Sequence, residues 1–359
     1  MKKKIMIMAY TYFNLGDDLF IKILIERYPR TKFYLFVPKR YRKVFPHSGN
    51  LIIIPSESLI LRGLNYIFRK FKIQNFCKML LLKDINATVE IGGSIFIQNQ
   101  NWKNKIADRK MLLSYNQEGK NFIIGANFGP YSTLDFVDNY TELFSYYEDI
   151  CFRDELSHNL FKKMSNIRIA SDVVFQLKHD TPSKIENNVI ISVIEPSNRA
   201  ELKDYGDLYY QKMKEISLAI IKSGREVVLM SFCKFEGDEV AIKEIMNIIP
   251  EEHKKQVNSY FYDNDLDEAL EIIRKSSAVV ATRFHAMILG WVYGKPVLPV
   301  VYSEKMTNVM EDAGYKGQYI SFDNLDMMNS DDLIKNLYEN IFDVFYAIIA
   351  YTYKKWKIG

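Results

Sequence analysis

Short apolar runs alternate with amphipathic runs along most of the 359-residue chain. In the first half, apolar runs predict strands at residues 4–10, 32–37, 51–54, 87–91, 121–126 and 149–152. Amphipathic runs between or after them predict helices at 17–28, 58–82, 105–118 and 135–147. Because short buried strands separated by helices form βαβ units, this pattern predicts a parallel sheet.

The alternation breaks at the polar, proline-containing segment 179–188 and then restarts. Beyond it we expect strands at 189–194, 226–232, 257–262, 278–283 and 296–302, helices at 207–223, 237–248, 265–275, 286–293 and 304–313, and a long apolar helical pattern over 331–354. The chain is therefore predicted to be an α/β protein with two Rossmann-like, doubly wound domains, residues 1–182 and 183–330, facing across a cleft. A C-terminal helix, residues 331–359, completes the predicted architecture.

The composition is that of a globular protein, with 48% hydrophobic and 26% charged residues. Apolar runs are too short for a spanning helix, which needs about 18 residues or more. The three cysteines, Cys77, Cys151 and Cys233, are scattered, so we expect no disulfide framework and a cytoplasmic location.

Charge is distributed unevenly along the chain. Residues 1–83 hold 17 Lys+Arg against 4 Asp+Glu, and the remainder holds 31 against 40. A basic end suggests an anionic partner, such as a membrane surface, a phosphorylated substrate or RNA, or simply a solvated basic face. Segment 64–82 interleaves basic and aromatic residues, which fits a membrane-surface helix or an ordinary helix packed on the sheet; the ordinary helix is the more general explanation.

Candidate ligand-binding residues follow predicted strands, because open α/β sheets bind ligands beyond the carboxyl ends of their strands. Three glycine-containing turns in the first half would expose backbone N–H groups to a phosphate or carboxylate. None has the spacing of a dinucleotide-binding or P-loop motif. The residues in these turns are Asn14, Gly16, Asp17, Gly92, Gly93, Ser94, Asn127 and Gly129.

Arg153 and Asp154 follow the strand predicted at 149–152. They fit a structural ion pair. They equally fit a guanidinium that binds an anionic ligand while the carboxylate orients it.

Arg283 and His285 lie where the strand predicted at 278–283 meets a helix. If this segment is extended, both face one side and Phe284 faces the other. A permanently charged donor beside an imidazole suits an anionic substrate that needs proton transfer. The alternative is a histidine that caps the helix and an arginine paired with a carboxylate. Lys305 follows the next strand and adds a cation at the same edge; no metal site is predicted.

In their order along the chain, these segments resemble the polysaccharide pyruvyl transferase family. Two departures from the family pattern occur: Ser94 stands where a third glycine is usual, and Val173-Val174 stands where Pro-Ala is usual. The resemblance rests on Asn14-x-Gly16-Asp17, Gly92-Gly93, Gly125-x-x-x-Gly129-Pro130, Arg153-Asp154 with Ser157, Asp172 with Phe175, Arg283-x-His285-Ala286, and Gly294-x-Pro296 leading to Tyr302-x-x-Lys305.

The resemblance implies a GT-B-like fold whose last helix can cross back to the first domain. It also implies transfer of pyruvyl from phosphoenolpyruvate to a sugar diol of a polysaccharide or lipid-linked glycan, giving a ketal and phosphate. No cofactor is implied, and Arg283, His285 and Arg153 are the implied donor-binding residues. A lipid-linked acceptor would bring the basic first domain to the inner membrane face; no nucleic-acid partner is expected.

Within this reading, His285 is the expected acid that protonates C3 of the enol, and Asp17 or Asp154 is the base that accepts a sugar-hydroxyl proton. Lys305, Phe284 and the residues of the glycine turns are expected to contact substrate. Two alternatives stay open from the sequence: a GT-B glycosyltransferase that uses a nucleotide sugar, and a non-catalytic glycan-assembly protein on the same fold.

Overall fold

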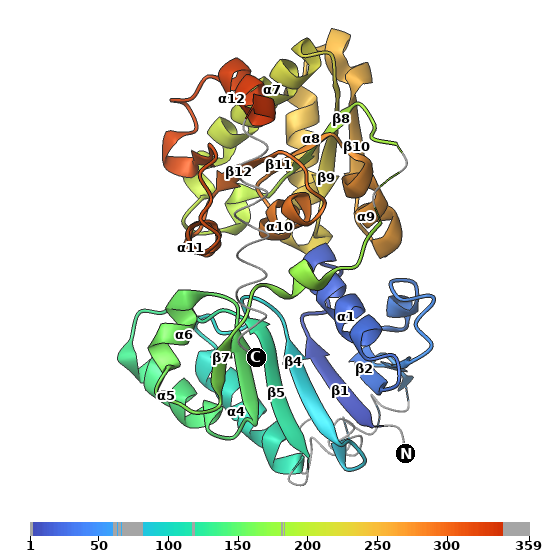
Figure 1. Ribbon diagram of the computed structural model, residues 1–359, viewed down its shortest axis with the longest axis vertical. Coiled ribbons are helices and arrows are strands. Elements are labelled where there is room, and N and C mark those ends of the chain that lie inside the picture. Colours follow the sequence, from blue (N-terminus) through green and yellow to red (C-terminus); the bar gives the residue numbers. More distant parts are fainter. Residues whose placement is uncertain are drawn as a thin grey trace. The chain divides into compact units, whose positions relative to one another are not determined.

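A computed structural model describes residues 3–59, 82–116, 119–180 and 184–339, together with residues 63, 66 and 182 (Figure 1). The chain divides into two compact units. The first comprises Met1–Thr11 and Asp17–Val173, and the second comprises Tyr12–Gly16 and Val174–Gly359. Each unit is built on a parallel sheet, which confirms the predicted α/β fold class.

The first sheet has seven strands in the order β3-β2-β1-β4-β5-β6-β7, and every neighbouring pair is parallel. The strand order reverses between β1 and β4, the position at which such sheets bind ligands. The strands are β1 (Lys4–Ala9), β2 (Lys32–Val37), β3 (Leu51–Pro55), β4 (Ala87–Ile91), β5 (Lys120–Ala126), β6 (Asp149–Phe152) and β7 (Ile167–Ile169). The helices are α1 (Leu15–Arg27), α4 (Trp102–Tyr115), α5 (Leu134–Phe144), α6 (Glu155–Phe161) and the short η1 (Lys39–Arg42).

Aromatic side chains fill much of the core of the first unit. Phe128 contacts six other aromatic rings, among them Phe136, Phe144 and Phe161. Such edge-on ring contacts add to the free energy gained from burial alone. Strand β4 is buried along its whole length, as expected for a central parallel strand covered on both faces.

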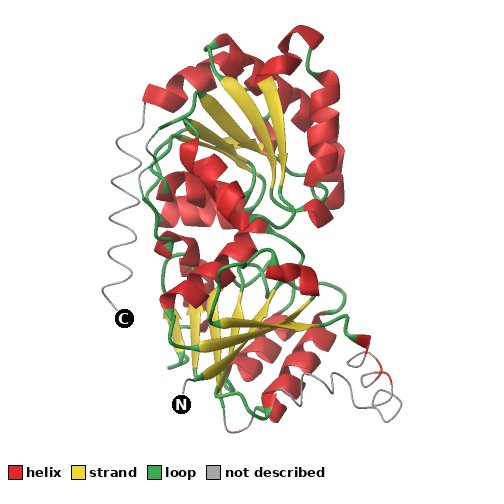
Figure 2. Ribbon diagram, turned by 90° about the vertical axis from the view of Figure 1, so that its right-hand side faces the viewer, coloured by secondary structure: helices red, strands yellow, loops and turns green. Residues whose placement is uncertain are grey.

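The second sheet has six strands in the order β10-β9-β8-β11-β12-β13, again all parallel, and its order reverses between β8 and β11. Figure 2 shows helices on both faces of each sheet. The strands are β8 (Asn188–Ser192), β9 (Glu226–Ser231), β10 (Val257–Phe261), β11 (Ala278–Ala281), β12 (Val297–Val301) and β13 (Ile320–Ser321). The helices are α7 (Gly206–Lys222), α8 (Asp238–Ile248), α9 (Leu266–Lys275), α10 (Phe284–Val292), α11 (Glu304–Asp312) and α12 (Ser330–Glu339). Short 3-10 helices are η2 (Val173–Gln176), η3 (Pro196–Asn198), η4 (Lys203–Tyr205), η5 (Lys234–Glu236), η6 (Glu251–Gln256) and η7 (Phe322–Asn324).

One local expectation is corrected and two strands were missed. The strand predicted at 278–283 ends at Ala281, so Arg283 is the N-cap of α10, and Phe284 and His285 form its first turn instead of alternating along a strand. The strands β7 and β13 were not predicted, because they carry too few residues to give a periodic signal in the sequence.

Other predicted boundaries meet the limits of the described residues. Most of the helix expected at 58–82 and the end of the helical pattern expected at 331–354 lie outside them. The two units change over between Val173 and Val174, whereas the sequence pattern places the boundary at 182–183. Within the described part of the chain, no helix combines the length and hydropathy needed to cross a bilayer.

Candidate functional site

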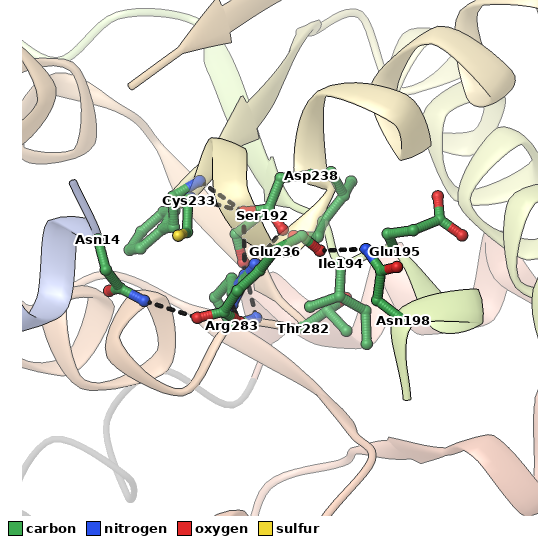
Figure 3. A network of polar contacts seen from close by, with 12 residues as sticks. Asn14, Ser192, Ile194, Glu195, Asn198, Cys233, Glu236, Asp238, Thr282 and Arg283 are labelled. Atoms are coloured by element: carbon green, nitrogen blue, oxygen red, sulfur yellow. Dashed lines mark hydrogen bonds and ion pairs between the residues drawn. The ribbon is translucent and has the colours of Figure 1, made fainter. Parts of the chain in front are cut away.

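Arg283 lies at the carboxyl end of β11, buried and bonded to two carboxylates (Figure 3). Its Nε donates to Oδ2 of Asp238 at 3.0 Å, and its Nη2 donates to the other oxygen of the same carboxylate. Its Nη1 donates to Oε2 of Glu236 at 2.5 Å. Of the alternatives left open by the sequence, an arginine paired with carboxylates therefore describes the geometry found.

The two carboxylates differ in how they are held. Asp238 is fully buried and also accepts the backbone N–H groups of Phe232 and Cys233 at 2.8 and 2.9 Å. The side chain of Glu236 is 29% exposed and is held by other side chains: besides Arg283 it accepts from Nη2 of Arg199 at 2.9 Å and from Nδ2 of Asn14 at 3.0 Å. Asp238 is thus a buried partner of Arg283 that the backbone also holds, whereas Glu236 lies at the surface of the cluster.

The charges of this cluster follow from its contacts. Burial would raise the pKa of Glu236, but Arg283, Arg199 and Lys305 outweigh it and hold that pKa at about 2. Burial raises the pKa of Asp238, against the opposing effect of Arg283. Glu236 is therefore ionised throughout the neutral range.

Tyr302 and Lys305 border the same cluster. The Tyr302 ring lies 5.1 Å from the guanidinium carbon of Arg199 and 5.5 Å from Nζ of Lys305, and Lys305 also lies 5.8 Å from the Phe284 ring. Burial raises the pKa of Tyr302, but the nearby cations Lys305, Arg199 and Arg283 lower it by more. The pKa of Tyr302 therefore lies below its ordinary value. Among the described residues, Lys305 forms no ion pair and the Tyr302 hydroxyl forms no hydrogen bond, so both keep donors for a ligand.

Gly16 makes room for the imidazole of His285. A Cβ atom at Gly16 would lie 1.8 Å from Nδ1 of His285, so no larger residue fits without moving the ring. The segment that carries Gly16 is fixed by a backbone hydrogen bond from Leu15 to Phe232 at 3.0 Å. We expected Gly16 to permit a turn; it lies instead in the first turn of α1, and the close approach of His285 is what requires glycine.

An exposed aromatic pair lies next to these residues in the sequence. Tyr12 and Phe235 are 52% and 62% exposed, and their rings meet edge-on at 5.7 Å between centroids. Each is close along the chain to a residue of the cluster, Asn14 and Glu236 respectively. The pair offers flat apolar surface to a ligand.

The first unit holds a second arginine cluster. Arg153, at the end of β6, is 2% exposed and donates from Nη1 to Asp172 and from Nη2 to Asn127, both at 2.7 Å. Ser94 donates to the same Asn127 oxygen at 3.1 Å. A Cβ at Gly93 would lie 2.5 Å from Nη2 of Arg153, so this glycine makes room for the guanidinium.

The remaining predicted residues of the first unit have local roles in the structure. Asp154 is the N-cap of α6, and its two oxygens accept from the backbone N–H and hydroxyl of Ser157 at 2.8 and 2.9 Å. Asp17 lies in the first turn of α1, with Oδ1 3.9 Å from where a Cβ of Gly92 would be. Gly129 has φ 104° and donates its N–H to the Phe96 carbonyl at 2.8 Å.

The predicted residues thus fall into two groups. The second unit brings together Asn14, Gly16, Arg283, Phe284, His285 and Lys305, and the first unit holds Asp17, Gly92, Gly93, Ser94, Asn127, Gly129, Arg153 and Asp154. Sequence reasoning did not select Arg199, Glu236, Asp238 or Tyr302 as site residues. All four follow strand ends of the second sheet, so applying the strand-end rule to every strand would have found them. Among the described residues, no cluster of His, Cys, Asp or Glu is arranged to hold a metal ion.

Several solved structures share the fold of this chain. They include ADP-heptose lipopolysaccharide heptosyltransferase II of E. coli (13% identity, 95% of this chain and 98% of that chain, TM-score 0.52). They also include Anabaena HepE with UDP and glucose (10%, 99% and 96%, 0.59) and S. aureus MnaA with UDP (12%, 97% and 91%, 0.58). At these identities the likeness shows the fold alone, and that fold is GT-B-like. No curated protein matches the sequence significantly.

The family comparison covers most of the chain. The family model described as polysaccharide pyruvyl transferase matches residues 14–304, which include both arginine clusters, Gly16 and His285. The match begins at Asn14 and ends at Glu304, next to Lys305. The chain therefore belongs to the polysaccharide pyruvyl transferase family.

Proposed function

We propose that the protein transfers pyruvyl from phosphoenolpyruvate to a sugar diol of a polysaccharide or lipid-linked glycan precursor, forming a cyclic ketal and releasing phosphate. The observation that carries the proposal is the cation cluster of Arg283, Arg199 and Lys305 in a chain of this family. Phosphoenolpyruvate carries a phosphate and a carboxylate, and bound anions of this kind need several charge-assisted donors.

Donor capacity remains in the cluster for such a ligand. Arg283 has five N–H donors, of which three go to Asp238 and Glu236. Lys305 and the Tyr302 hydroxyl add donors beside it. The guanidinium stays charged at any accessible pH, because its two carboxylates raise its pKa despite burial.

The proposed reaction has two stages. His285 donates a proton to C3 of the enol, which becomes a methyl group, and a sugar hydroxyl adds to the cationic C2 as it loses its own proton to a base. The C2–O bond to phosphate then breaks, phosphate leaves with the bonding electrons, and the second hydroxyl adds to C2, passes its proton to the departing phosphate and closes the ring. Both oxygens of Asp154 are committed to Ser157, which favours Asp17 as the base.

A glycan acceptor is supported by the aromatic pair. Sugar rings pack their C–H faces on flat aromatic side chains, and Tyr12 and Phe235 expose such faces. If the acceptor is lipid-linked, the enzyme works at a membrane surface. The basic residues 1–83, including the exposed side chains of Lys39, Arg40, Arg42 and Lys43, fit an anionic membrane, and we propose a peripheral contact there.

A second candidate is a GT-B glycosyltransferase that uses a nucleotide sugar. It is favoured by the UDP bound in the structures of HepE and MnaA, which share the fold. The family match favours the pyruvyl transferase. Binding of a nucleoside diphosphate in the absence of phosphoenolpyruvate binding would favour the glycosyltransferase.

The proposal is tested by measuring phosphate released from phosphoenolpyruvate in the presence of candidate diol glycans. His285→Ala should lower the rate by about 10²–10⁴-fold, the usual contribution of a general acid. His253→Ala, which removes an imidazole from η6, is the matched control and should keep the rate. Full activity of His285→Ala would refute the assignment of the acid. Failure of every glycan, together with tight nucleotide binding, would refute the reaction.

A further inference from the structure

Glu236 occupies a small anion-binding site within its own protein. Donors from three separate segments converge on its carboxylate. Arg283 at the end of β11 and Asn14 after β1 are seen in Figure 3, and Arg199 after β8 is the third. Two of these are guanidinium groups, whose planar shape suits a planar carboxylate. A donor set of this kind is what a ligand carboxylate would require.

The attachment of Glu236 differs from that of a permanent structural ion pair. Asp238 pairs with the same arginine, but it is fully buried and anchored by two backbone N–H groups. Glu236 has 29% of its side chain exposed, and the contacts of its carboxylate are with side chains. Asp238 alone supplies a buried counter-charge to Arg283, so the buried position of the guanidinium does not depend on Glu236.

The backbone of Glu236 is fixed independently of its carboxylate. Its carbonyl accepts from Nδ2 of Asn198 at 3.0 Å, and its N–H donates to the Cys233 carbonyl at 3.2 Å. The side chain therefore leaves the three donors by rotation about its own bonds, toward the solvent that it already touches. No rearrangement of η5 is required.

On the basis of the proposed function, we infer that Glu236 stands in for the carboxylate of the anionic donor and lowers the affinity of the site for every ligand that must displace it. It occupies the site formed by Arg283, Arg199 and Asn14 in the unliganded protein, and the donor carboxylate displaces it. A ligand whose single anionic group is a carboxylate merely replaces the Glu236 carboxylate, so it gains little binding free energy. Phosphoenolpyruvate also brings a phosphate, which Lys305 and Tyr302 are free to bind. Phosphoenolpyruvate therefore binds despite the exchange, whereas simple carboxylates such as pyruvate bind weakly.

This exchange has a measurable consequence. When a competing group occupies a site most of the time, the apparent dissociation constant rises in inverse proportion to the fraction of sites left open. If the open fraction is about one tenth, removal of the Glu236 charge tightens binding about tenfold. A residue that merely positions Arg283 would have the opposite effect, because its removal would loosen the guanidinium and weaken binding.

The test is a calorimetric titration of the full-length protein and three variants with phosphoenolpyruvate and with pyruvate. Glu236→Gln removes the charge and keeps the shape, and Glu236→Asp keeps the charge and shortens the reach. Glu239→Gln is the matched control, since it removes one negative charge from the same region, where Glu239 pairs with Lys234 at 3.4 Å. Glu239→Gln measures the general electrostatic effect of that loss.

We expect Glu236→Gln to bind both ligands about tenfold more tightly than Glu239→Gln, and Glu236→Asp to lie between it and the unaltered protein. Should Glu236→Gln be too unstable to titrate, Glu236→Asp decides alone: tighter binding supports the inference and weaker binding overturns it. Glu236→Gln should also be less stable without ligand, because it loses two ionic hydrogen bonds. Lower stability with tighter binding distinguishes a stand-in from a structural residue.

Failure of the inference is distinguishable from failure of the proposed function. If Glu236→Gln binds phosphoenolpyruvate and pyruvate no more tightly than Glu239→Gln, Glu236 is not a stand-in, whatever the reaction. If no variant binds phosphoenolpyruvate but Glu236→Gln gains affinity for pyruvate, the stand-in holds and the proposed donor is wrong. If neither ligand binds any variant, the site takes no such carboxylate and both are wrong.

Discussion

Two buried arginines, one in each unit, follow strand ends of a parallel sheet, and each pairs with a buried aspartate. Arg153 and Asp172 are 2% and 0% exposed at their side chains, and Arg153 also donates to an amide, Asn127. Arg283 shares its guanidinium between the buried Asp238 and the partly exposed Glu236. The second cluster therefore reaches solvent through a carboxylate, whereas the first is enclosed.

We propose that the second cluster is the first to meet a ligand, and the prediction that Arg153 also binds the donor stays a prediction. In the first cluster, Arg153 and Asp172 are both buried and paired, so removal of either charge leaves a buried charge without this partner. In the second cluster, Arg199 and Lys305 add cations around Glu236, and the donors of Lys305 and Tyr302 stay uncommitted among the described residues. A buried arginine after a strand end is thus ambiguous in sequence, and its neighbours decide its role.

The largest expected effect is on stability in the first unit. Asp172→Asn removes the buried carboxylate that pairs with Arg153, so the free energy of unfolding should fall by about 3–5 kcal/mol. Asp331→Asn is the control: it breaks an exposed pair with Lys222 and should cost about 1 kcal/mol or less. Denaturant unfolding measures both. Equal losses would mean that the buried Arg153–Asp172 pair contributes no more to stability than an exposed ion pair does.

The next effect is on activity in the second unit. Gly16→Ala places a methyl group at the position of Nδ1 of His285 and must displace the imidazole, so kcat should fall about 100-fold while the fold persists. Gly49→Ala, at a glycine with nothing within 4 Å of the added Cβ, should leave kcat unchanged. Unaltered activity of Gly16→Ala would remove His285 from the reaction.

A smaller effect concerns acid stability. The folded-state pKa of Glu236, about 2, lies below the ordinary value of 4.5, so its ionised form stabilises the fold above pH 4.5, and this stabilisation is lost as the pH falls toward 2. The unaltered protein should therefore lose more free energy of unfolding between pH 5 and pH 2 than Glu236→Gln does. Denaturant titrations over this range test it, and parallel pH profiles would contradict the charge assigned to Glu236.

The smallest effect concerns the acceptor. Phe235→Ala removes half of the aromatic pair and should raise KM for the glycan about threefold to tenfold, the size expected for one aromatic contact. KM for phosphoenolpyruvate should stay the same. Phe261→Ala, at an exposed aromatic residue of β10, is the control. A rise in both KM values would mean that Phe235 supports the donor site instead.

Much of the fold follows from local sequence patterns, and the partners within the site do not. The apolar runs that form β4, β11 and β12 are buried on both sides, so each carries a strong signal. The sequence also pointed to both arginines. Their carboxylate partners lie on other strand ends, 19 residues from Arg153 and 45 and 47 residues from Arg283, so no local pattern reveals them.

The roles of two glycines were also not predictable from local sequence. Gly16 and Gly93 were predicted as ligand-binding turn residues because glycine after a strand permits tight turns. In the structure, each makes room for a side chain that is distant in sequence, His285 and Arg153 respectively. Such close approaches depend on tertiary packing, which a single sequence does not specify.

The most direct test of the central claim is a calorimetric titration with phosphoenolpyruvate and, separately, with UDP, using the unaltered protein and Lys305→Ala. Lys305 is partly exposed and forms no ion pair among the described residues, so its loss should leave the fold intact. We predict that phosphoenolpyruvate binds, that Lys305→Ala weakens this binding about tenfold, equivalent to about 1.4 kcal/mol, and that UDP does not bind. Binding of UDP with no binding of phosphoenolpyruvate would contradict the account.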